Sequence, residues 1–187
     1  NLISALHKSL RGSDPDAAVY YLMRMIETGE DPLFPARRML IFAAEDVGLA
    51  DPHALPLALA AAQSFERLGL PEGTLVLCEA ALYLATAPKS NSVIVARDRA
   101  VEAVRRHGTA PIPDALRDGT AALSKTLGLG VGYRYPHDEP GAHAAVPYLP
   151  SPLQGEEFYE PSEQGAESSI AERLTRWRAA VRKARQE

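Results

Sequence analysis

The longest apolar stretch of the chain runs from Thr74 to Ala87 and contains a single charged residue, Glu79. Read as a helix, this stretch has no polar face, so it must be covered on every side or cross a membrane. A membrane-spanning helix needs about 20 apolar residues, and Pro88 ends this run too early. We therefore predict a central core helix, in which Leu82→Ala costs about 2–5 kcal/mol of stability.

Shorter amphipathic helices are predicted before this core helix. The first covers Leu2 to Leu10, and Gly12 is expected to take the left-handed conformation that closes many helices. Three more helices each begin at an Asp-Pro pair, in which the aspartate caps free backbone amides and the proline suits the first turn. These helices run from Asp14 to Gly29, from Asp31 to Gly48 and from Asp51 to Gly69. Their side-chain patterns do not match, so the similarity reflects shared capping chemistry and not a structural repeat.

A sixth helix is predicted after the core helix, beginning at Ser90 or Asn91 and ending at His107. Its inward-facing positions are expected to be Val93, Ala96, Ala100 and Val104. Two short helical pieces follow, over residues 114–118 and 120–127. The region shows no alternation of apolar and polar residues of the kind a strand would show, so helix is the predicted structure throughout.

Residues 128–165 differ in kind from the rest of the chain. Three glycines and then six prolines exclude a regular element, while the aromatic residues argue against disorder. We predict an ordered strap that lies over the helices and forms one or two short strand pairings. A last helix begins near Gly165 and carries an apolar stripe on one side. The stripe consists of Ile170, Leu174, Trp177 and Val181.

These patterns predict an all-α protein: a compact multi-helix domain with a long Pro/Gly-rich ordered strap and a C-terminal helix. The expected divisions are a helical core over residues 1–128, the strap packed on that core over 129–165, and a basic amphipathic helix over 166–187. With 187 residues, the chain is long enough for one sizeable core or two small ones.

The composition is that of an ordinary soluble protein, with 46% hydrophobic and 24% charged residues. A net charge of −4 argues against wholesale attraction to nucleic acid or membranes. Cys78 is the only cysteine, so no disulfide can form within one chain and a reducing, cytoplasmic location is expected. We interpret its side chain as a small buried hydrophobe. The helical pattern is already under way at Leu2, which indicates a fragment of a longer protein, and no signal peptide or membrane span is seen.

No motif for catalysis, nucleotide binding or metal binding is found. The segment Ser124-Lys125-Thr126 lacks the glycine scaffold of a phosphate loop, and the glycine cluster at 128–132 neither follows a strand nor opens a helix. The loop residues with metal-binding side chains do not have the spacing of a standard site. They are His137, Asp138, Glu139 and His143. We therefore expect no catalytic residue, cofactor or metal in this chain, and no binding or hydrolysis of ATP by the chain alone.

Charged residues are grouped along the chain. Residues 138–167 carry seven acids and no Lys or Arg, whereas residues 170–185 carry six bases and one acid. A second basic group surrounds the sixth helix: Lys89, Arg97, Arg99, Arg105 and Arg106. One interpretation of these bases is a phosphate-contacting surface. The other is solvated helix faces, with C-terminal bases that complement the helix dipole, and the spread of the arginines around the helix favours it.

Five segments carry a family resemblance. They are SALHKSLRGSDPDAAVYYLMRMIETGEDP (4–32), ARRMLIFAAEDVGLADPHAL (36–55), LPEG (70–73), YLATAPKSN (83–91) and GYRYPHDEP (132–140). In this order they resemble the replication-associated recombination protein A family of AAA+ ATPases, called MgsA in bacteria, whose eukaryotic counterpart is the Werner helicase-interacting protein. The resemblance covers nearly the whole chain.

The resemblance implies that this region follows the ATPase module and its lid, is related to the collar of clamp-loader subunits, and joins subunits into a tetramer. It also implies that the full protein is a DNA-stimulated ATPase acting at stalled replication forks, with ATP and Mg²⁺ bound upstream of Asn1. The chain departs from the family pattern at Asp118-Gly119-Thr120, at Ala122 and Val131, where an Arg and a Lys are usual, and at Val146. These departures count against DNA contact by that loop.

We therefore predict an oligomerisation and interaction domain of a AAA+ ATPase that acts in replication-fork maintenance, recombination and repair. The candidate faces for the interface are the Ile170, Leu174, Trp177 and Val181 stripe and the alanine-rich segment at 57–65, and the sequence does not decide which of them is free. The alternative is a DNA-binding module that uses the basic sixth helix and the basic tail, with weak, salt-sensitive binding. The expected partners are three further copies of the chain, and replication proteins and DNA through the full-length protein, in the cytoplasm and associated with the nucleoid.

Overall fold

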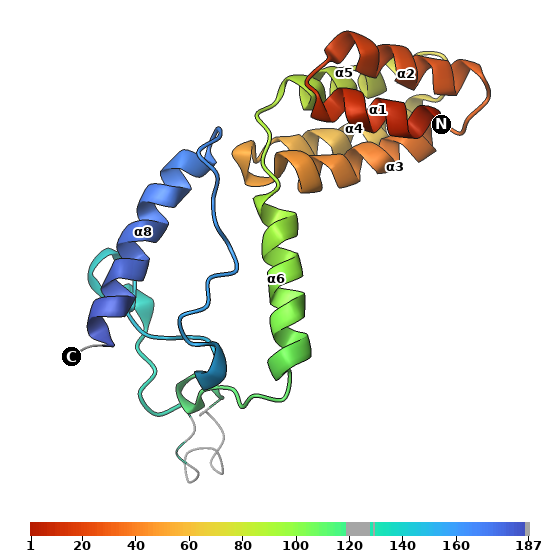
Figure 1. The fold of residues 1–187 in the computed structure, drawn as a ribbon. Coiled ribbons are helices and arrows are strands. Elements are labelled where there is room, and N and C mark those ends of the chain that lie inside the picture. Colours follow the sequence, from red (N-terminus) through yellow and green to blue (C-terminus); the bar gives the residue numbers. More distant parts are fainter. Residues whose placement is uncertain (119–127, 129, 186–187) are drawn as a thin grey trace. The chain divides into compact units, whose positions relative to one another are not determined.

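The computed structural model describes residues 1–118, 128 and 130–185 (Figure 1). Within these residues the chain forms seven α-helices, short π and 3-10 turns, and no strand, so the all-α prediction is confirmed. The helices are α1 (Leu2–Arg11), α2 (Pro15–Glu27), α3 (Leu33–Phe42), α4 (Ala54–Leu68), α5 (Gly73–Thr86), α6 (Ser92–His107) and α8 (Glu167–Ala184). The strand pairings expected in the strap are not found in its described residues. The short helix expected over 120–127 lies outside the described part of the chain.

The chain divides into two compact units. Unit 1 consists of Asn1–Ala96 and Tyr159–Ile170, and unit 2 consists of Arg97–Phe158 and Ala171–Glu187. The boundaries fall inside α6 and α8, so each of these helices contributes its first residues to unit 1. This division differs from the expected one at 128 and 165, because the last strap residues belong to unit 1 and most of α6 belongs to unit 2.

Helix α5 is the central helix of unit 1, as predicted, because it contacts α1, α2, α3 and α4. Helix α1 also packs against α2, and α3 against α4 (Figure 1). The interior contains large side chains that have no exposed surface: Leu6, Leu10, Leu22, Phe42, Leu77 and Leu84. Ala80, Ala81 and Ala85 of α5 are equally buried, and their small side chains let the neighbouring helices approach closely.

The outer side of α5 is not covered, which corrects the prediction of a helix buried all round. Leu75 is 73% exposed and Leu82 is 43% exposed. The buried positions between Leu77 and Ala85 repeat with the spacing of one helical face. An apolar sequence marks α5 as central, but it does not show which side faces the neighbouring helices. The expected loss for Leu82→Ala therefore falls from about 2–5 kcal/mol to below about 1 kcal/mol.

Of the three Asp-Pro starts, Asp14 caps its helix as predicted, whereas Asp31 and Asp51 form turns at the starts of α3 and α4, which have no side-chain cap. The carboxylates of Asp14, Asp31 and Asp51 accept hydrogen bonds from backbone N–H groups two or three residues ahead, at 2.9, 3.0 and 3.0 Å. The end of α1 differs from the expectation, because Gly12 has right-handed backbone angles. The left-handed residue is Ser13, with a φ of 58°.

Two further details differ from the sequence expectation. Helix α3 passes into one turn of π-helix, Ala43–Val47, which the sequence did not indicate. On α6, the expected inward positions Val93 and Val104 are wrong, since they are 37% and 64% exposed while Ala103 is buried. Helix α6 contributes to both units, so no single face has to be buried along its whole length.

The described part of the strap has no α-helix before α8 and contains short 3-10 turns. These turns lie at Pro136–Asp138, Pro140–Ala142 and Ser151–Leu153. Ala144 and Leu153 are buried, so the strap is anchored by small apolar contacts. None of the helices in the described residues combines the length and the hydropathy needed to cross a membrane.

Candidate functional site

The five residues predicted to contact DNA are divided between the two units. Lys89 belongs to unit 1, and its ammonium group donates hydrogen bonds to the carbonyl oxygens of Ala85 at 2.9 Å and Ala87 at 2.6 Å. It also donates to the hydroxyl of Ser13 at 3.2 Å. Burial lowers the pKa of Lys89 from its ordinary value. Lys89 thus satisfies carbonyl groups at the end of α5, which is a structural role.

The other four predicted DNA contacts lie on the part of α6 that belongs to unit 2: Arg97, Arg99, Arg105 and Arg106. All four are exposed. Arg97 pairs with the neighbouring Asp98 at 2.8 Å, and Arg106 pairs with Glu156 at 3.4 Å. Exposed ion pairs of this kind are weak, so they leave the guanidinium groups able to exchange partners.

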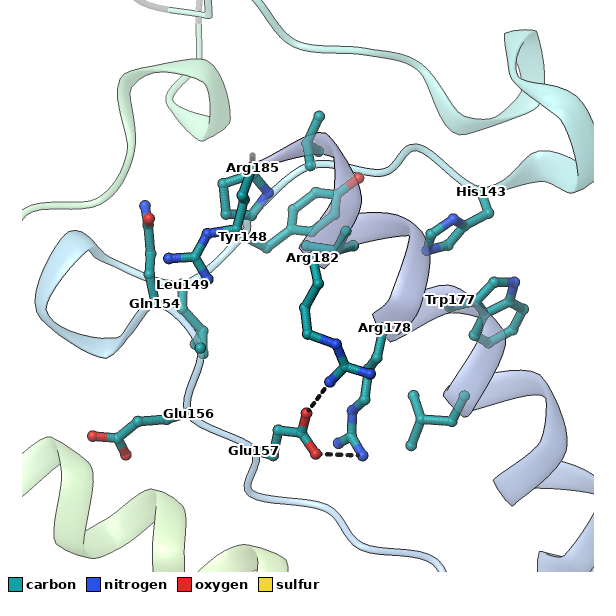
Figure 2. A pocket seen from close by; sticks show the side chains of 15 residues that line it. His143, Tyr148, Leu149, Gln154, Glu156, Glu157, Trp177, Arg178, Arg182 and Arg185 are labelled. Carbon is teal, nitrogen blue, oxygen red and sulfur yellow. Dashed lines mark hydrogen bonds and ion pairs between the residues drawn. The ribbon is translucent and has the colours of Figure 1, made fainter. Parts of the chain in front are cut away.

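Three residues of the predicted apolar stripe line a pocket of unit 2 with a volume of about 370 Å³ (Figure 2). They are Leu174, Trp177 and Val181 of α8. The fourth stripe residue, Ile170, belongs to unit 1. The strap supplies further lining residues, among them the run 146–149. The structure therefore brings most of the stripe next to the strap.

Arginine side chains also line this pocket. Arg178 and Arg182 lie on successive turns of the C-terminal part of α8, and Arg185 directly follows the end of the helix. Glu157 forms ion pairs with Arg178 at 3.0 Å and with Arg182 at 3.3 Å (Figure 2). One carboxylate thus lies between two guanidinium groups, and the third arginine adds to the positive charge of the pocket.

Aromatic rings complete the pocket. Trp177 is 42% exposed and Tyr148 is 45% exposed. The imidazole of His143 stacks on Trp177, with ring centroids 5.4 Å apart and planes only 6° from parallel (Figure 2). The pocket therefore combines aliphatic side chains, flat rings and guanidinium groups.

A separate cluster in unit 1 surrounds Glu167, the first residue of α8, which has no exposed surface. Its carboxylate accepts hydrogen bonds from the hydroxyls of Ser90 at 2.5 Å, Tyr159 at 2.8 Å and Ser162 at 2.6 Å, and from that of Ser92. The backbone N–H of Ser162 donates another at 3.0 Å. Burial alone would raise the pKa of Glu167, but the hydrogen bonds lower it to about 2. The ionised carboxylate fastens the end of the strap to the turn before α6.

The backbone just before Glu167 is held in the same place. The N–H of Ala166 donates to the carbonyl oxygen of Ala50 at 2.8 Å. Gly165 has a φ of 51°, and a Cβ at this position would overlap the same carbonyl oxygen, so glycine is required. The sequence did not indicate this cluster, because Ser90 lies 77 positions before Glu167. An acid in the first turn of a helix is an ordinary start signal and does not by itself indicate burial.

Unit 1 also presents leucines on the outer sides of α4 and α5, two helices that pack against each other. Leu55 and Leu59 on α4 are 46% and 45% exposed, and Leu75 and Leu82 on α5 are 73% and 43% exposed. The two residues on α4 are four positions apart and the two on α5 are seven apart, so each pair lies on one side of its helix. We call these four residues the leucine surface. The sequence indicated it only in part: Leu59 lies in the predicted segment 57–65, but α5 was expected to be fully covered.

The loop histidines take part in ring contacts. His143 stacks on Trp177, and His137 packs against Tyr135 with centroids 5.1 Å apart. Across residues 1–118, 128 and 130–185, no three metal-binding side chains are grouped so that they could hold an ion.

Comparison with known proteins places this chain among longer relatives. The family described as MgsA AAA+ ATPase C terminal matches residues 12–178. The replication-associated recombination protein A of Coxiella burnetii is 49% identical over 177 residues, which are 94% of this chain and 40% of that protein. The protein of the same name from Escherichia coli K12 is 46% identical over 175 residues, which are 93% of this chain and 39% of that protein. ATPase WRNIP1 of Dictyostelium discoideum is 44% identical over 161 residues, which are 85% of this chain and 18% of that protein. This chain thus spans about two fifths of the length of the two bacterial relatives.

Proposed function

This chain belongs to the family of MgsA AAA+ ATPase C-terminal regions, and we propose that it is the part through which such an ATPase forms oligomers and meets its partners. The bacterial relatives are named replication-associated recombination proteins. We propose for the whole protein an ATPase activity with ATP and Mg²⁺, stimulation by DNA, and a role at replication forks in the cytoplasm, close to the nucleoid.

The leucine surface is the observation that carries the oligomerisation proposal. Helix α5 is the most apolar of the helices in the described residues, yet Leu75 and Leu82 are exposed in a single copy. Burying a leucine fully is worth roughly 1.5–3 kcal/mol, so covering both of them provides a substantial driving force. Exposed apolar patches on soluble proteins usually mark interaction sites. A second copy of the same surface is the simplest cover, since two-fold symmetry makes a patch its own partner.

A tetramer is the proposed assembly. Two different two-fold contacts build a closed tetramer, and the predicted stripe on α8 is the candidate for the second contact. Leu174, Trp177 and Val181 line the pocket of unit 2, and Trp177 keeps 42% of its surface exposed. The stripe therefore has only part of its surface available to a second copy of the chain. We propose that the leucine surface forms the stronger of the two subunit contacts.

Light scattering on the 187-residue chain at tens of micromolar tests the proposal. We expect a mass of four copies for the wild type, little changed by moderate salt, because apolar burial is not screened. Leu75→Asp with Leu82→Asp should reduce this mass. The control is Val104→Asp with Ile112→Asp, two unit 2 side chains that are 64% and 62% exposed.

A monomer mass for the wild type would overturn the proposal. If instead Leu174→Asp dissociated the assembly and the leucine variant did not, the α8 stripe would be the main interface. Circular dichroism on each variant separates loss of assembly from loss of fold. Isothermal calorimetry with ATP is a separate measurement, for which we expect no binding by this chain, because it offers no glycine-cradled phosphate site.

The second candidate function is DNA binding through Lys89, Arg97, Arg99, Arg105 and Arg106. Hydrogen bonds within unit 1 hold Lys89, whereas the α6 arginines are exposed. We therefore propose that α6 contributes only weak binding that falls steeply as salt rises. Arg105→Ala with Arg106→Ala should change such binding by less than about tenfold near physiological ionic strength. Tight, salt-resistant binding that this pair of substitutions abolishes would contradict the proposal.

A further inference from the structure

We propose that the pocket of unit 2 binds an unstacked base of single-stranded nucleic acid, with Trp177 and Tyr148 against the base and Arg182 and Arg185 against the neighbouring phosphates. All four residues line the same pocket and belong to unit 2. The proposal deepens the DNA-binding alternative, which already included the basic tail. It does not depend on oligomerisation or on the α6 arginines, so the pocket can fail as a binding site without affecting either of those proposals.

The charge of the chain is divided between the two units. Unit 1 has 7 Lys and Arg against 14 Asp and Glu, a net charge of −7. Unit 2 has 13 Lys and Arg against 10 Asp and Glu, a net charge of +3, and the two sum to the −4 of the whole chain. The net charge of the whole chain is therefore negative although unit 2 is positively charged. Of the two units, only unit 2 would attract nucleic acid through its net charge.

Flat rings with exposed surface are the second observation. Tyr148 and Trp177 are both close to half exposed, although both line the pocket. The parallel packing of His143 on Trp177 shows that the indole already accepts a stacked ring on one side. Aromatic side chains of this kind serve as stacking platforms in proteins that bind single strands.

The arrangement of the arginines provides the phosphate contacts. Arg178 and Arg182 both pair with Glu157, which marks a place where an anion lies between two guanidinium groups. A guanidinium group has five N–H donors, so Arg182 can bind a phosphate oxygen while it still pairs with Glu157. Arg185, which directly follows the end of α8, also lines the pocket. A strand whose base enters the pocket would therefore pass its backbone along these side chains.

A single strand fits these features better than a duplex. In a duplex the bases are stacked and paired, so their faces are not available to protein rings. The pocket offers ring faces beside guanidinium groups, which suits a base with its phosphates. Aromatic-lined grooves and arginine clusters also bind peptides, so titration with an acidic peptide is the comparison that separates a peptide partner from a single strand.

Trp177 makes the test direct, because it is the only tryptophan of the chain and its fluorescence reports on this pocket. The 187-residue chain is titrated with a short oligothymidylate at low ionic strength, and separately with a duplex of equal length and with an acidic peptide. We expect the oligothymidylate to quench the fluorescence strongly, the duplex to quench it much less, and added salt to weaken the effect.

Matched variants locate the binding. Tyr148→Ala should weaken oligothymidylate binding about five- to 150-fold, the range for loss of one base–aromatic stack, while Tyr148→Phe should stay close to wild type. Arg182→Ala with Arg185→Ala should weaken it at least about tenfold. The control is Arg173→Ala with Arg176→Ala, which removes the same charge from α8 outside the pocket lining and should weaken binding less than about threefold.

Three results would overturn the proposal. The first is oligothymidylate binding, seen by its own fluorescent label, without quenching of Trp177. The second is an equal loss of affinity in both arginine pairs, which would indicate general charge attraction. The third is quenching by the acidic peptide in place of the oligothymidylate. Should Tyr148→Ala lose its fold by circular dichroism, Tyr148→Phe and the two arginine pairs still decide the outcome.

Discussion

The forces that stabilise unit 1 internally differ from those that stabilise unit 2. Within the described residues, nearly all buried hydrophobic side chains belong to unit 1. Those of unit 2 are Ala103, Ala144 and Leu153. Unit 2 relies more on exposed ion pairs, such as that between Glu157 and Arg182, and on ring contacts. The difference indicates that unit 1 should respond to lost apolar volume and unit 2 to salt and charge.

Truncating a core leucine of unit 1 should have the largest effect. Leu84 has no exposed surface, so Leu84→Ala should lower the free energy of unfolding by about 2–5 kcal/mol. Leu153→Ala in unit 2 should cost at most about 2 kcal/mol, because Leu153 has few buried apolar neighbours around which a cavity could form. Urea unfolding followed by circular dichroism measures both changes. Equal losses of unfolding free energy would show that Leu153 is packed as well as Leu84, and would contradict the proposed difference between the units.

Removing the Glu167 carboxylate should have the next largest effect. Glu167→Ala leaves four buried or half-buried hydroxyls without their shared acceptor, which should cost about 2–4 kcal/mol. Glu167→Gln is the matched control, since it keeps the shape and one acceptor oxygen and should cost less. The urea midpoint of each variant gives the comparison. If Glu167→Ala were as stable as wild type, the hydrogen bonds would not be fastening the strap end to unit 1.

The Glu167 carboxylate makes the stability of unit 1 depend on pH. The pKa of Glu167 is about 2 in the folded protein, against an ordinary value of 4.5, so the unfolded chain binds more protons between these values. Its contribution to stability is fully present above about pH 4.5 and is lost as the pH falls toward about 2. Wild type and Glu167→Gln should therefore differ most near neutral pH and become alike in acid. A constant difference from pH 7 to pH 3 would contradict this pKa.

The sequence predicted the features of this fold that depend on nearby residues. The cap at Asp14 and the central place of α5 follow from local chemistry and composition. The exposure of Leu82 and the burial of Glu167 depend on which distant segments pack against them, and one sequence does not contain that information. Of the candidate site, the stripe on α8 was found from its spacing, whereas its neighbours on the strap, such as Tyr148, come from an irregular segment that has no periodicity to read.

Leu82→Ala compares an exposed leucine with a buried leucine of the same helix, α5. Leu82 and Leu84 are neighbours on α5, but Leu82 is 43% exposed and Leu84 is fully buried. In dilute solution, where copies are separated, Leu82→Ala should cost below about 1 kcal/mol. At higher concentration it should reduce the mass seen by light scattering, because it shortens the leucine surface. A stability loss equal to that of Leu84→Ala would mean that α5 is covered on both sides within a single copy.

The smallest effect is expected for the ion pairs of unit 2. Glu157 pairs with Arg178 and Arg182, and its side chain is 38% exposed, so Glu157→Gln should change stability by only about 0–1 kcal/mol. The change should shrink further as salt rises. The fluorescence of Trp177 followed through urea unfolding measures it. A larger, salt-independent loss would show that this pair is shielded from solvent and carries the fold of unit 2.

The return of the chain to unit 1 at Tyr159–Ile170 makes unit 1 discontinuous, because the segment 97–158 between its two parts belongs to unit 2. The cost of closing a flexible loop rises only slowly with its length, so insertions or deletions among relatives should be tolerated within this segment more readily than inside α1–α5. A single proteolytic cut in the strap would also leave the C-terminal fragment attached, because Glu167 and Ala166 still bind Ser90 and Ala50. The cut protein should therefore migrate as one particle under native conditions and as two fragments after denaturation.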